Sequence, residues 1–228
     1  VMREPVNWVV DMDLAQLFDT MPHTEILAVL SEQSAEQQVL RLIARRLKAG
    51  VQTPGGVGYD ELGSPHGSSV SPVIAKACLD HGLDQGFVGV VRRHGHGYGN
   101  LLRYADDALA VVETADDARR VLRVLPVRLG KLGWRLNTQK THRVAVGKRL
   151  AWQVLGGGGR MPTVDFRGFT HDWGRSRSGK ARLQRKTSKT RLRRALVELN
   201  QWLRQERSAR KLPDLGQAIA QKMRGHFN

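Results

Sequence analysis

The sequence is poor in the features that mark secreted and membrane proteins. Its 228 residues include a single cysteine, Cys78, so no intramolecular disulfide can form and a reducing compartment fits. No apolar run approaches the roughly 20 residues that a membrane-spanning helix needs. The N-terminal VMREPVNW lacks the apolar core of a signal peptide. Apolar residues still make up 40% of the chain, which is enough for a core. We therefore expect a soluble cytoplasmic protein.

Acidic residues are also scarce, above all in the last third of the chain. The net charge is +16, and residues 160–228 hold 18 Lys and Arg against 5 Asp and Glu, whereas residues 1–159 hold 19 against 16. Between Arg175 and Arg194 there are ten basic residues and no acidic one. Such a cluster favours binding to phosphate groups, because neutralising the phosphates releases their counterions. Apolar residues are scarce from 175 to 191, so a membrane-surface segment is a weaker alternative, and a merely solvated face is another. Nucleic acid is the favoured partner.

Hydrophobic spacing predicts an alternation of strands and helices. Strands are expected at residues 8–14, at 134–136, at 143–146, and as two short strands meeting at an Asp pair within 101–112, with a hairpin in 51–67. Helices are expected at 23–49, at 71–85, from 115 with Thr114 as its cap and a kink at Pro126, from 188, and from near 213, with a glycine break at 156–159. This order indicates an α+β fold in which helices cover one face of an antiparallel sheet.

Three carboxylates stand on or beside the predicted strands. Asp13 lies within the predicted strand WVVDMDL, and Asp106 and Asp107 interrupt the apolar stretch LRYADDALAVV. Adjacent charges in such a stretch repel one another and lose hydration, and a bound cation would compensate that cost. Two distant strands can pair and bring the three carboxylates together as oxygen ligands for Mg²⁺. The alternative is that Asp13 caps a turn and the Asp pair is a solvated hairpin tip.

The chain resembles the reverse transcriptases encoded by bacterial group II introns, in six blocks that occur in the family's order. RYADD (103–107) resembles the family's RYADD box, and VVDMDLAQLFDTMPH (9–23) resembles its first catalytic strand. LKAGV (47–51) with GSPHGSSVSPVIAKACL (63–79) resembles the "GTPQG…SPLLAN" block, with His66 in place of Gln. LGWRLNTQKT (132–141), FRGF (166–169) and the last segment resemble the family's "LGL-LN-KT" element, FLGF box and thumb.

The resemblance implies a polymerase palm with partial fingers and an α-helical thumb or maturase segment. It assigns residues 1–159 to the palm and partial fingers, 160–187 to a basic primer-grip connector, and 188–228 to a partial thumb, as in a chain truncated at both ends. The implied activity is RNA-directed DNA polymerisation, in which a primer 3′-hydroxyl attacks the α-phosphate of a dNTP. The implied partners are an RNA template, intron RNA and a DNA primer. The alternative is a non-catalytic RNA-binding maturase-like protein or a decayed fragment.

The same resemblance assigns roles to individual residues. Two Mg²⁺ ions are implied, held by Asp13, Asp106 and Asp107 as catalytic residues. The residues implied in nucleotide and template binding are Phe18, Pro65, His66, Gly67 and Lys140; those of the primer grip are Phe166, Gly168 and Phe169. The residues implied in RNA binding are Arg175, Arg177, Lys180, Arg182, Arg185, Lys186, Lys189 and Arg191, with Trp173 as a candidate for stacking on bases.

Overall fold

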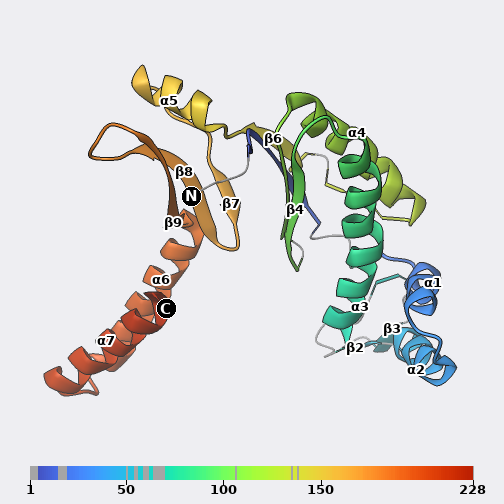
Figure 1. Ribbon diagram of the computed structural model, residues 1–228. Helices are drawn as coiled ribbons and strands as arrows, with labels where there is room; N and C mark the ends of the chain where they lie inside the picture. The colour runs from blue at the N-terminus through green and yellow to red at the C-terminus, as the bar shows by residue number, and fades with distance from the viewer. Residues whose placement is uncertain are drawn as a thin grey trace.

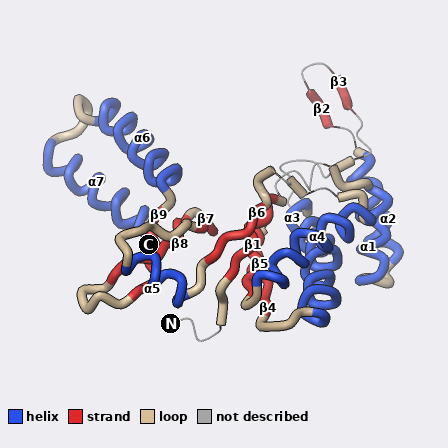
Figure 2. The backbone as a smooth tube through the Cα atoms, turned by 90° about the horizontal axis from the view of Figure 1, so that it is seen from above, coloured by secondary structure: helices blue, strands red, loops and turns tan. Residues whose placement is uncertain are grey.

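The computed structural model describes three parts of the chain that follow one another in space (Figure 1). It describes residues 5–14, 20–49, 51–53, 56–58, 62–63, 70–105, 107–134, 136–137 and 139–227. A four-stranded sheet with helices on one face is followed by a three-stranded sheet and then by a helical hairpin. Figure 2 shows the four-stranded sheet between the helical layer and the three-stranded sheet.

The four-stranded sheet pairs strands that are far apart in sequence. It consists of β1 (Trp8–Asp13), β4 (Gly99–Tyr104), β5 (Asp107–Val112) and β6 (His142–Ala145), in the order β4-β5-β1-β6, with antiparallel neighbours throughout. Val10 and Met12 of β1 are buried on the helical side, while Val9, Asp11 and Asp13 alternate onto the other face. The predicted β1 and the pairing of distant strands are therefore confirmed.

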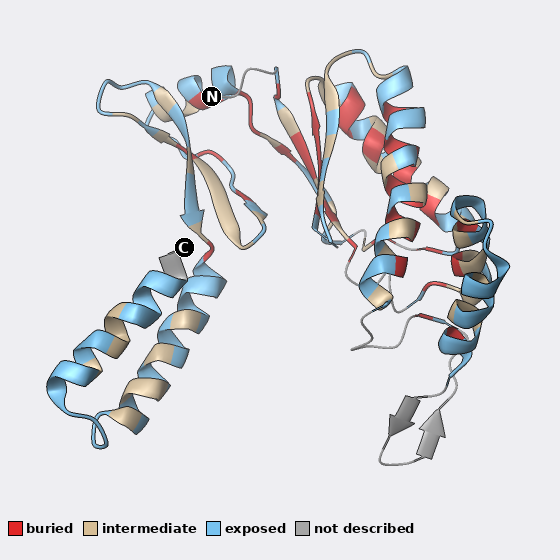
Figure 3. Cartoon of the chain, turned by 60° about the horizontal axis from the view of Figure 1, so that its bottom comes forward, coloured by how far each residue is buried: buried red, intermediate tan, exposed pale blue. Residues whose placement is uncertain are grey.

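Helices cover one face of this sheet and enclose the main core (Figure 3). They are α1 (His23–Gln33), α2 (Gln37–Lys48), α3 (Ser71–Leu79), the π-helical segments η1 (Asp80–Asp84) and η2 (Phe87–Arg92), and α4 (Ala115–Lys131). Thr114 caps α4 as predicted, because its side chain accepts a hydrogen bond from the Asp117 amide. Cys78 is fully buried in this core, and burial raises the pKa of its thiol to about 11.

Several element boundaries differ from the expectation. The helix expected at 23–49 is two helices, because the Ser34 hydroxyl accepts the Glu36 amide at 3.3 Å and competes with helical bonding. The helix expected at 71–85 continues through η2. The strand predicted at 134–136 is wrong: Trp134 and Leu136 are buried in the main core outside any strand. The helix α4 continues through Pro126, and the predicted hairpin is present as β2 (Val51–Thr53) and β3 (Gly56–Gly58).

The basic connector forms a sheet of its own. After α5 (Lys148–Gly156), which was not predicted, β7 (Val164–Phe166), β8 (Phe169–Arg175) and β9 (Ala181–Thr187) pair in that order. Trp173 packs with Ala151 and Met161, and its indole N–H donates to the Val146 carbonyl at 2.8 Å. Trp173 is only 8% exposed, so the expectation that it stacks on bases is wrong.

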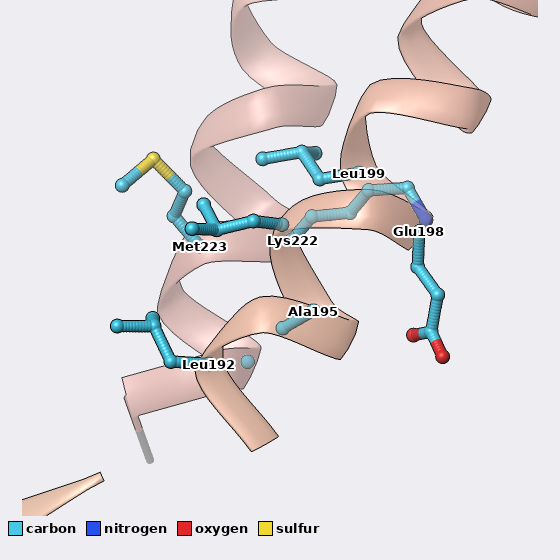
Figure 4. A pocket seen from close by; sticks show the side chains of 8 residues that line it. Leu192, Ala195, Glu198, Leu199, Lys222 and Met223 are labelled. Carbon is cyan, nitrogen blue, oxygen red and sulfur yellow. The ribbon is translucent and has the colours of Figure 1, made fainter. Parts of the chain in front are cut away.

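The chain ends in two helices that lie side by side. Ser188 caps α6 (Lys189–Glu206), and α7 (Leu212–Phe227) returns along it, so both predicted helices are confirmed. Leu192, Leu199 and Met223 line an apolar groove of about 380 Å³ between the two helices (Figure 4). Within the described ranges, no helix is both long and apolar enough to cross a membrane.

Candidate active site

The carboxylates of the sequence motifs meet on the sheet face opposite the helices. Asp13 of β1 lies directly across from Asp107 of β5, and Asp107 lies across from Tyr104 of β4, so the three residues form a row over three strands. Ala105, in the turn between β4 and β5, has a φ of +55°, a left-handed conformation that suits a tight hairpin. Asp106 lies outside the described residues. The row brings together two of the three predicted ligands.

A lysine is held against the first carboxylate of the row. The ammonium of Lys140 lies 3.1 Å from an Asp13 carboxylate oxygen. The side-chain oxygen of Asn137 accepts the amides of Gln139 and Lys140 at 3.2 and 3.3 Å, and the Asn137 amide donates to the Asp13 carbonyl at 3.4 Å. This Asx turn folds the LNTQKT segment back onto the end of β1 and delivers the predicted Lys140 to Asp13.

A cleft of about 530 Å³ opens along this row. Its polar lining includes Asp11, Asp13, Asp107, Asp165 and Lys140. Burial raises the pKa of the Asp11 carboxyl above its ordinary value; His142 opposes the rise, and the charges of Asp107, Asp13 and Asp165 add to it. The cleft therefore has excess negative charge that favours a cation.

His142 stabilises the same corner of the cleft. It pairs with Asp11 in the β1–β6 register, so the two residues share the face that carries Asp13. Its Nδ1 donates to the Lys140 carbonyl at 2.7 Å, which ties the start of β6 to the turn that carries the lysine.

The FRGF segment is a tight hairpin over the end of the row. Phe166 and Phe169 pair across it, while Arg167 and Gly168 have φ values of +54° and +75°, as a type I′ turn requires. The Arg167 amide donates to the Asp107 carboxylate at 3.3 Å, and the Arg167 guanidinium lies 4.0 Å from the centre of the Tyr104 ring. The structure thus connects the predicted primer-grip segment directly to a predicted catalytic carboxylate.

The donor set suits a hard divalent cation. Asp13 and Asp107 offer carboxylate oxygens from directly opposite strand positions, and the cation already beside Asp13 is the Lys140 ammonium. Among the residues that the structure describes, no group of three His, Cys, Asp or Glu side chains is arranged to hold a metal ion. Asp106, the third predicted ligand, stands next to Asp107 in the sequence and is not among those residues.

The predicted RNA-binding residues extend from the end of β8 into α6, and all eight are exposed. Lys186 forms an ion pair with Asp172 at 2.8 Å, and the Arg185 guanidinium lies 4.8 Å from the centre of the Phe169 ring. The Arg191 side chain donates to the Arg167 carbonyl at 3.2 Å. The basic surface is therefore continuous with the hairpin that touches the carboxylate row.

Sequence reasoning missed the residues that assemble the site through backbone bonds. Asn137, Arg167 and His142 were not singled out, although Asn is a residue type that favours Asx turns. Four residues predicted for nucleotide and template binding lie outside the described residues: Phe18, Pro65, His66 and Gly67.

Comparison with known proteins agrees with this geometry. The family model described as "Reverse transcriptase (RNA-dependent DNA polymerase)" matches residues 3–171. The chain is 38% identical over 79 residues to an uncharacterised 91 kDa protein in the cob intron of Schizosaccharomyces pombe, covering 35% of this chain and 10% of that protein. It is 36% identical over 75 residues to a putative COX1/OXI3 intron 2 protein of Saccharomyces cerevisiae, covering 32% and 9%. The chain thus spans about a tenth of the length of these relatives.

Solved structures with a similar fold include telomerases. An apo telomerase of Candida tropicalis, truncated from its C-terminal domain, superposes with a TM-score of 0.57 at 15% identity, over 81% of this chain and 36% of that one. A telomerase of Candida albicans in complex with the TWJ fragment of telomeric RNA has a TM-score of 0.53 at 14% identity, over 74% and 30%. These likenesses confirm the right-hand polymerase fold, and the intron proteins confirm the resemblance to intron-encoded reverse transcriptases.

Proposed function

The chain belongs to the reverse transcriptase family, and we propose that it is an RNA-directed DNA polymerase of the group II intron type. The observation that carries the proposal is the placement of Asp13 opposite Asp107, with the Lys140 ammonium 3.1 Å from Asp13. The reaction is attack of a primer 3′-hydroxyl on the α-phosphate of a dNTP, with pyrophosphate as the leaving group. The RNA template, DNA primer and dNTP are the proposed substrates, and intron RNA is the proposed partner.

Reverse transcriptases use divalent metal ions, and we propose two Mg²⁺ ions held by Asp13, Asp106 and Asp107. When bound, such ions activate the attacking hydroxyl and stabilise charge on the leaving group. The negative charge of the carboxylates that line the cleft would be offset by those cations. The protein's own contribution is positioning, because both described carboxylates lie on paired strands rather than on loops.

The remaining residues of the proposed site are each assigned to the part of the substrates that they are proposed to contact. Lys140 is proposed to bind the triphosphate or to protonate the departing pyrophosphate. Phe18 is proposed to lie against the sugar of the incoming nucleotide, and Pro65, His66 and Gly67 to hold nucleotide and template. The hairpin formed by Phe166, Gly168 and Phe169 is proposed to hold the primer end, which its bond to Asp107 supports.

We propose the domain division that the resemblance implied: palm and partial fingers (1–159), connector (160–187) and thumb (188–228). The separate β7-β8-β9 sheet and the Ser188 cap of α6 support the last two boundaries. The exposed basic residues of the connector and α6 are proposed to track RNA phosphates. They are Arg175, Arg177, Lys180, Arg182, Arg185, Lys186, Lys189 and Arg191.

The test is primer extension on an RNA template with Mg²⁺ and dNTPs, comparing the wild-type chain with Asp106→Asn and Asp13→Asn. We expect extension by the wild type and a loss of at least about 100-fold in each variant, since each removes charge stabilisation in the transition state. Glu206→Gln is the control, because it makes the same charge change at a half-buried carboxylate of α6 that pairs with Arg210, away from the carboxylate row. Extension that persists in both aspartate variants contradicts the proposed site.

A second function is favoured by the charge distribution. The excess of 18 basic over 5 acidic residues in 160–228 suits a protein that binds RNA without catalysis, as a maturase-like chain would. The two functions separate experimentally, because RNA binding by this surface does not need the carboxylate row. Wild-type RNA affinity in Asp106→Asn, without extension by either protein, would favour the second function.

A further inference from the structure

The HGHG segment before β4 forms a hollow together with one face of α4. The hollow has a volume of about 480 Å³ and is lined by His96, Asp116, Arg119, Arg120 and Arg123. Three guanidinium groups therefore face a single lining carboxylate. Nothing in the proposed polymerase site uses these residues.

This hollow lies at the far end of the sheet from the carboxylate row. The strands β4 and β5 pair from Gly99 opposite Val112 to Tyr104 opposite Asp107. The HGHG loop leads into the first pair, whereas the candidate active site is at the last. Five residue steps of about 3.4 Å each separate the two ends by about 17 Å. A ligand in the hollow therefore occupies a separate surface.

The loop that closes the hollow is held rigidly by one buried carboxylate. Asp117 is 2% exposed and accepts hydrogen bonds from the amides of His96 and Gly97 at 3.1 and 3.2 Å and from the Thr114 hydroxyl at 2.7 Å. A Cβ at Gly95 would lie 2.9 Å from the Val91 carbonyl oxygen, and one at Gly97 would lie 2.7 Å from a Glu113 carboxylate oxygen. At Gly95 the near atom belongs to the backbone, so a larger residue there would require the turn itself to shift.

The arginines have more N–H donors than their contacts within the protein use, and these donors can face the hollow. Arg120 donates to the His94 carbonyl, and its guanidinium has five N–H donors in all. Arg119 pairs with Asp116 at the surface, and Arg123 is exposed one turn further along α4. Arg92 and Arg93, both exposed, come just before His94 and extend the positive surface. Asp117 points into the loop bonds and is not part of the lining.

We propose that this hollow, with the adjoining arginines, is a second RNA contact that binds backbone phosphates. Arginine forks match phosphate oxygens in geometry and charge. Arg119 and Arg123 are four residues apart on one helix, about 6 Å along its axis, so they can reach neighbouring phosphates of one strand. The inference rests on the proposed function only for the choice of RNA as the polyanion. It adds a surface about a strand's length from the active site, where RNA outside the template would bind.

The test measures RNA binding alone, without metal ion, primer or dNTP. A labelled RNA duplex is titrated with the wild-type chain, with Arg119→Gln/Arg123→Gln, and with the control Arg41→Gln/Arg45→Gln. The control pair has the same spacing and exposure on α2, at the other end of the helical layer (Figure 1). We expect the α4 pair to weaken binding about tenfold at 0.1 M salt and to reduce the slope of log K against log [salt] by about 2. The α2 pair should stay within about twofold of the wild type.

Equal losses in both pairs would show that only total charge matters and would overturn the proposal, as would unchanged binding in both. Inorganic phosphate and polyglutamate are titrated in parallel. A loss of phosphate binding with RNA affinity retained would indicate a small phosphate ligand instead, and a loss confined to polyglutamate would indicate an acidic protein; both results overturn it. Urea unfolding midpoints confirm that each variant is folded. Because no polymerisation is measured, failure of the proposed polymerase activity would leave this result standing.

Discussion

Lys140 is the residue whose role the geometry defines most sharply. Its ammonium lies beside Asp13, yet its side chain is 70% exposed, so the ion pair itself adds less than about 1 kcal/mol to stability. We expect Lys140→Gln to lower kcat for primer extension by about 10²-fold while leaving the unfolding midpoint in urea nearly unchanged. Single-turnover extension and urea unfolding, on the same preparations, are the measurements.

Lys140→Arg separates the two proposed roles of this residue. Arginine keeps the positive charge but does not release a proton at working pH. Recovery of activity in Lys140→Arg indicates binding of the triphosphate, and continued loss indicates proton donation. Full activity in Lys140→Gln would exclude both roles.

Asp117 gives a prediction for the dependence of stability on pH. Burial alone would raise the pKa of Asp117, but the hydrogen bonds from Thr114, His96 and Gly97 outweigh it and hold the pKa below its ordinary value. The stabilisation is therefore complete above the unfolded-state pKa of about 4 and is lost as pH falls through the lower folded value. We expect Asp117→Asn to lower the free energy of unfolding by about 1–3 kcal/mol at pH 7.

The difference between Asp117→Asn and the wild type should shrink below about pH 4, as urea unfolding at pH 7 and pH 3 would show. Asp116→Asn is the matched control, because that carboxylate is the exposed neighbour that pairs with Arg119. It should change stability by less than about 0.5 kcal/mol at either pH. A difference for Asp117→Asn that grew on acidification would contradict the assignment.

The sequence predicted the site's charged side chains better than the bonds that position them. Asp13, Asp107 and Lys140 were identified because each stands in a motif with a chemical role, and the structure brings the three together. The Asn137 turn and the Arg167 amide were missed. The Arg167 contact runs through a backbone amide, which every residue has, so the sequence carries little sign of it. The Asn137 turn uses a side-chain oxygen, so its residue type was a signal that was not used.

At the scale of elements, the β7–β8 hairpin depends on one glycine for its shape. Gly168 has a φ of +75°, and a Cβ there would lie 2.4 Å from a guanidinium nitrogen of Arg191. Gly179 has nearly the same φ, +76°, but open space around it. The two glycines therefore share the conformational constraint and differ in the close contact.

We expect Gly179→Ala to lower the free energy of unfolding by about 1 kcal/mol, from conformation alone. Gly168→Ala should cost more and should also reduce primer extension, because displacing Arg191 or the turn moves the Arg167 amide away from Asp107. Urea unfolding and extension assays on both variants provide the comparison. Equal effects on both measurements would show that the contact with Arg191 does not position the hairpin.

Helices and strands with a clear apolar periodicity were predicted. The others were missed because of local features that leave no such periodicity. The strands β1 and β6 and the helices α4, α6 and α7 show regular apolar spacing or a cap. The break at Ser34 was missed because a side-chain bond to the Glu36 amide, rather than a proline or glycine, ends α1. The helix α5 was missed because only Ala151 of its nine residues is buried, which leaves a weak pattern.

For the molecule as a whole, the positive charge of the C-terminal third should control RNA affinity. We expect Arg182→Gln/Arg185→Gln/Lys189→Gln to weaken binding of an RNA duplex by more than tenfold at 0.1 M salt and to reduce the salt slope by about 3. Filter binding between 0.05 and 0.3 M salt would show both effects. Removing the same charge from α2, as Arg41→Gln/Arg45→Gln/Lys48→Gln, should have a much smaller effect, and equal losses would contradict a localised surface.

The order of the sequence motifs predicted the architecture of the whole molecule better than the hydrophobic pattern did. Periodicity indicated a sheet covered by helices on one face, and the structure confirms it. It did not predict that residues 164–187 form a second sheet, because β9 has no buried residue and its burial does not alternate along the strand. The hairpin of α6 and α7 has no buried residue in α6, so its place beside the second sheet has little sequence signature.

Because Cys78 is buried, the rate at which a thiol reagent labels it can measure opening of the core. The thiol is inaccessible in the main core, and with a pKa near 11 almost none of it is thiolate at neutral pH. A thiol reagent therefore reacts only with molecules whose core has opened. Because the chain has one cysteine, each molecule takes up one label. The labelling rate of any variant reports how often the core around Cys78 opens, without a denaturant.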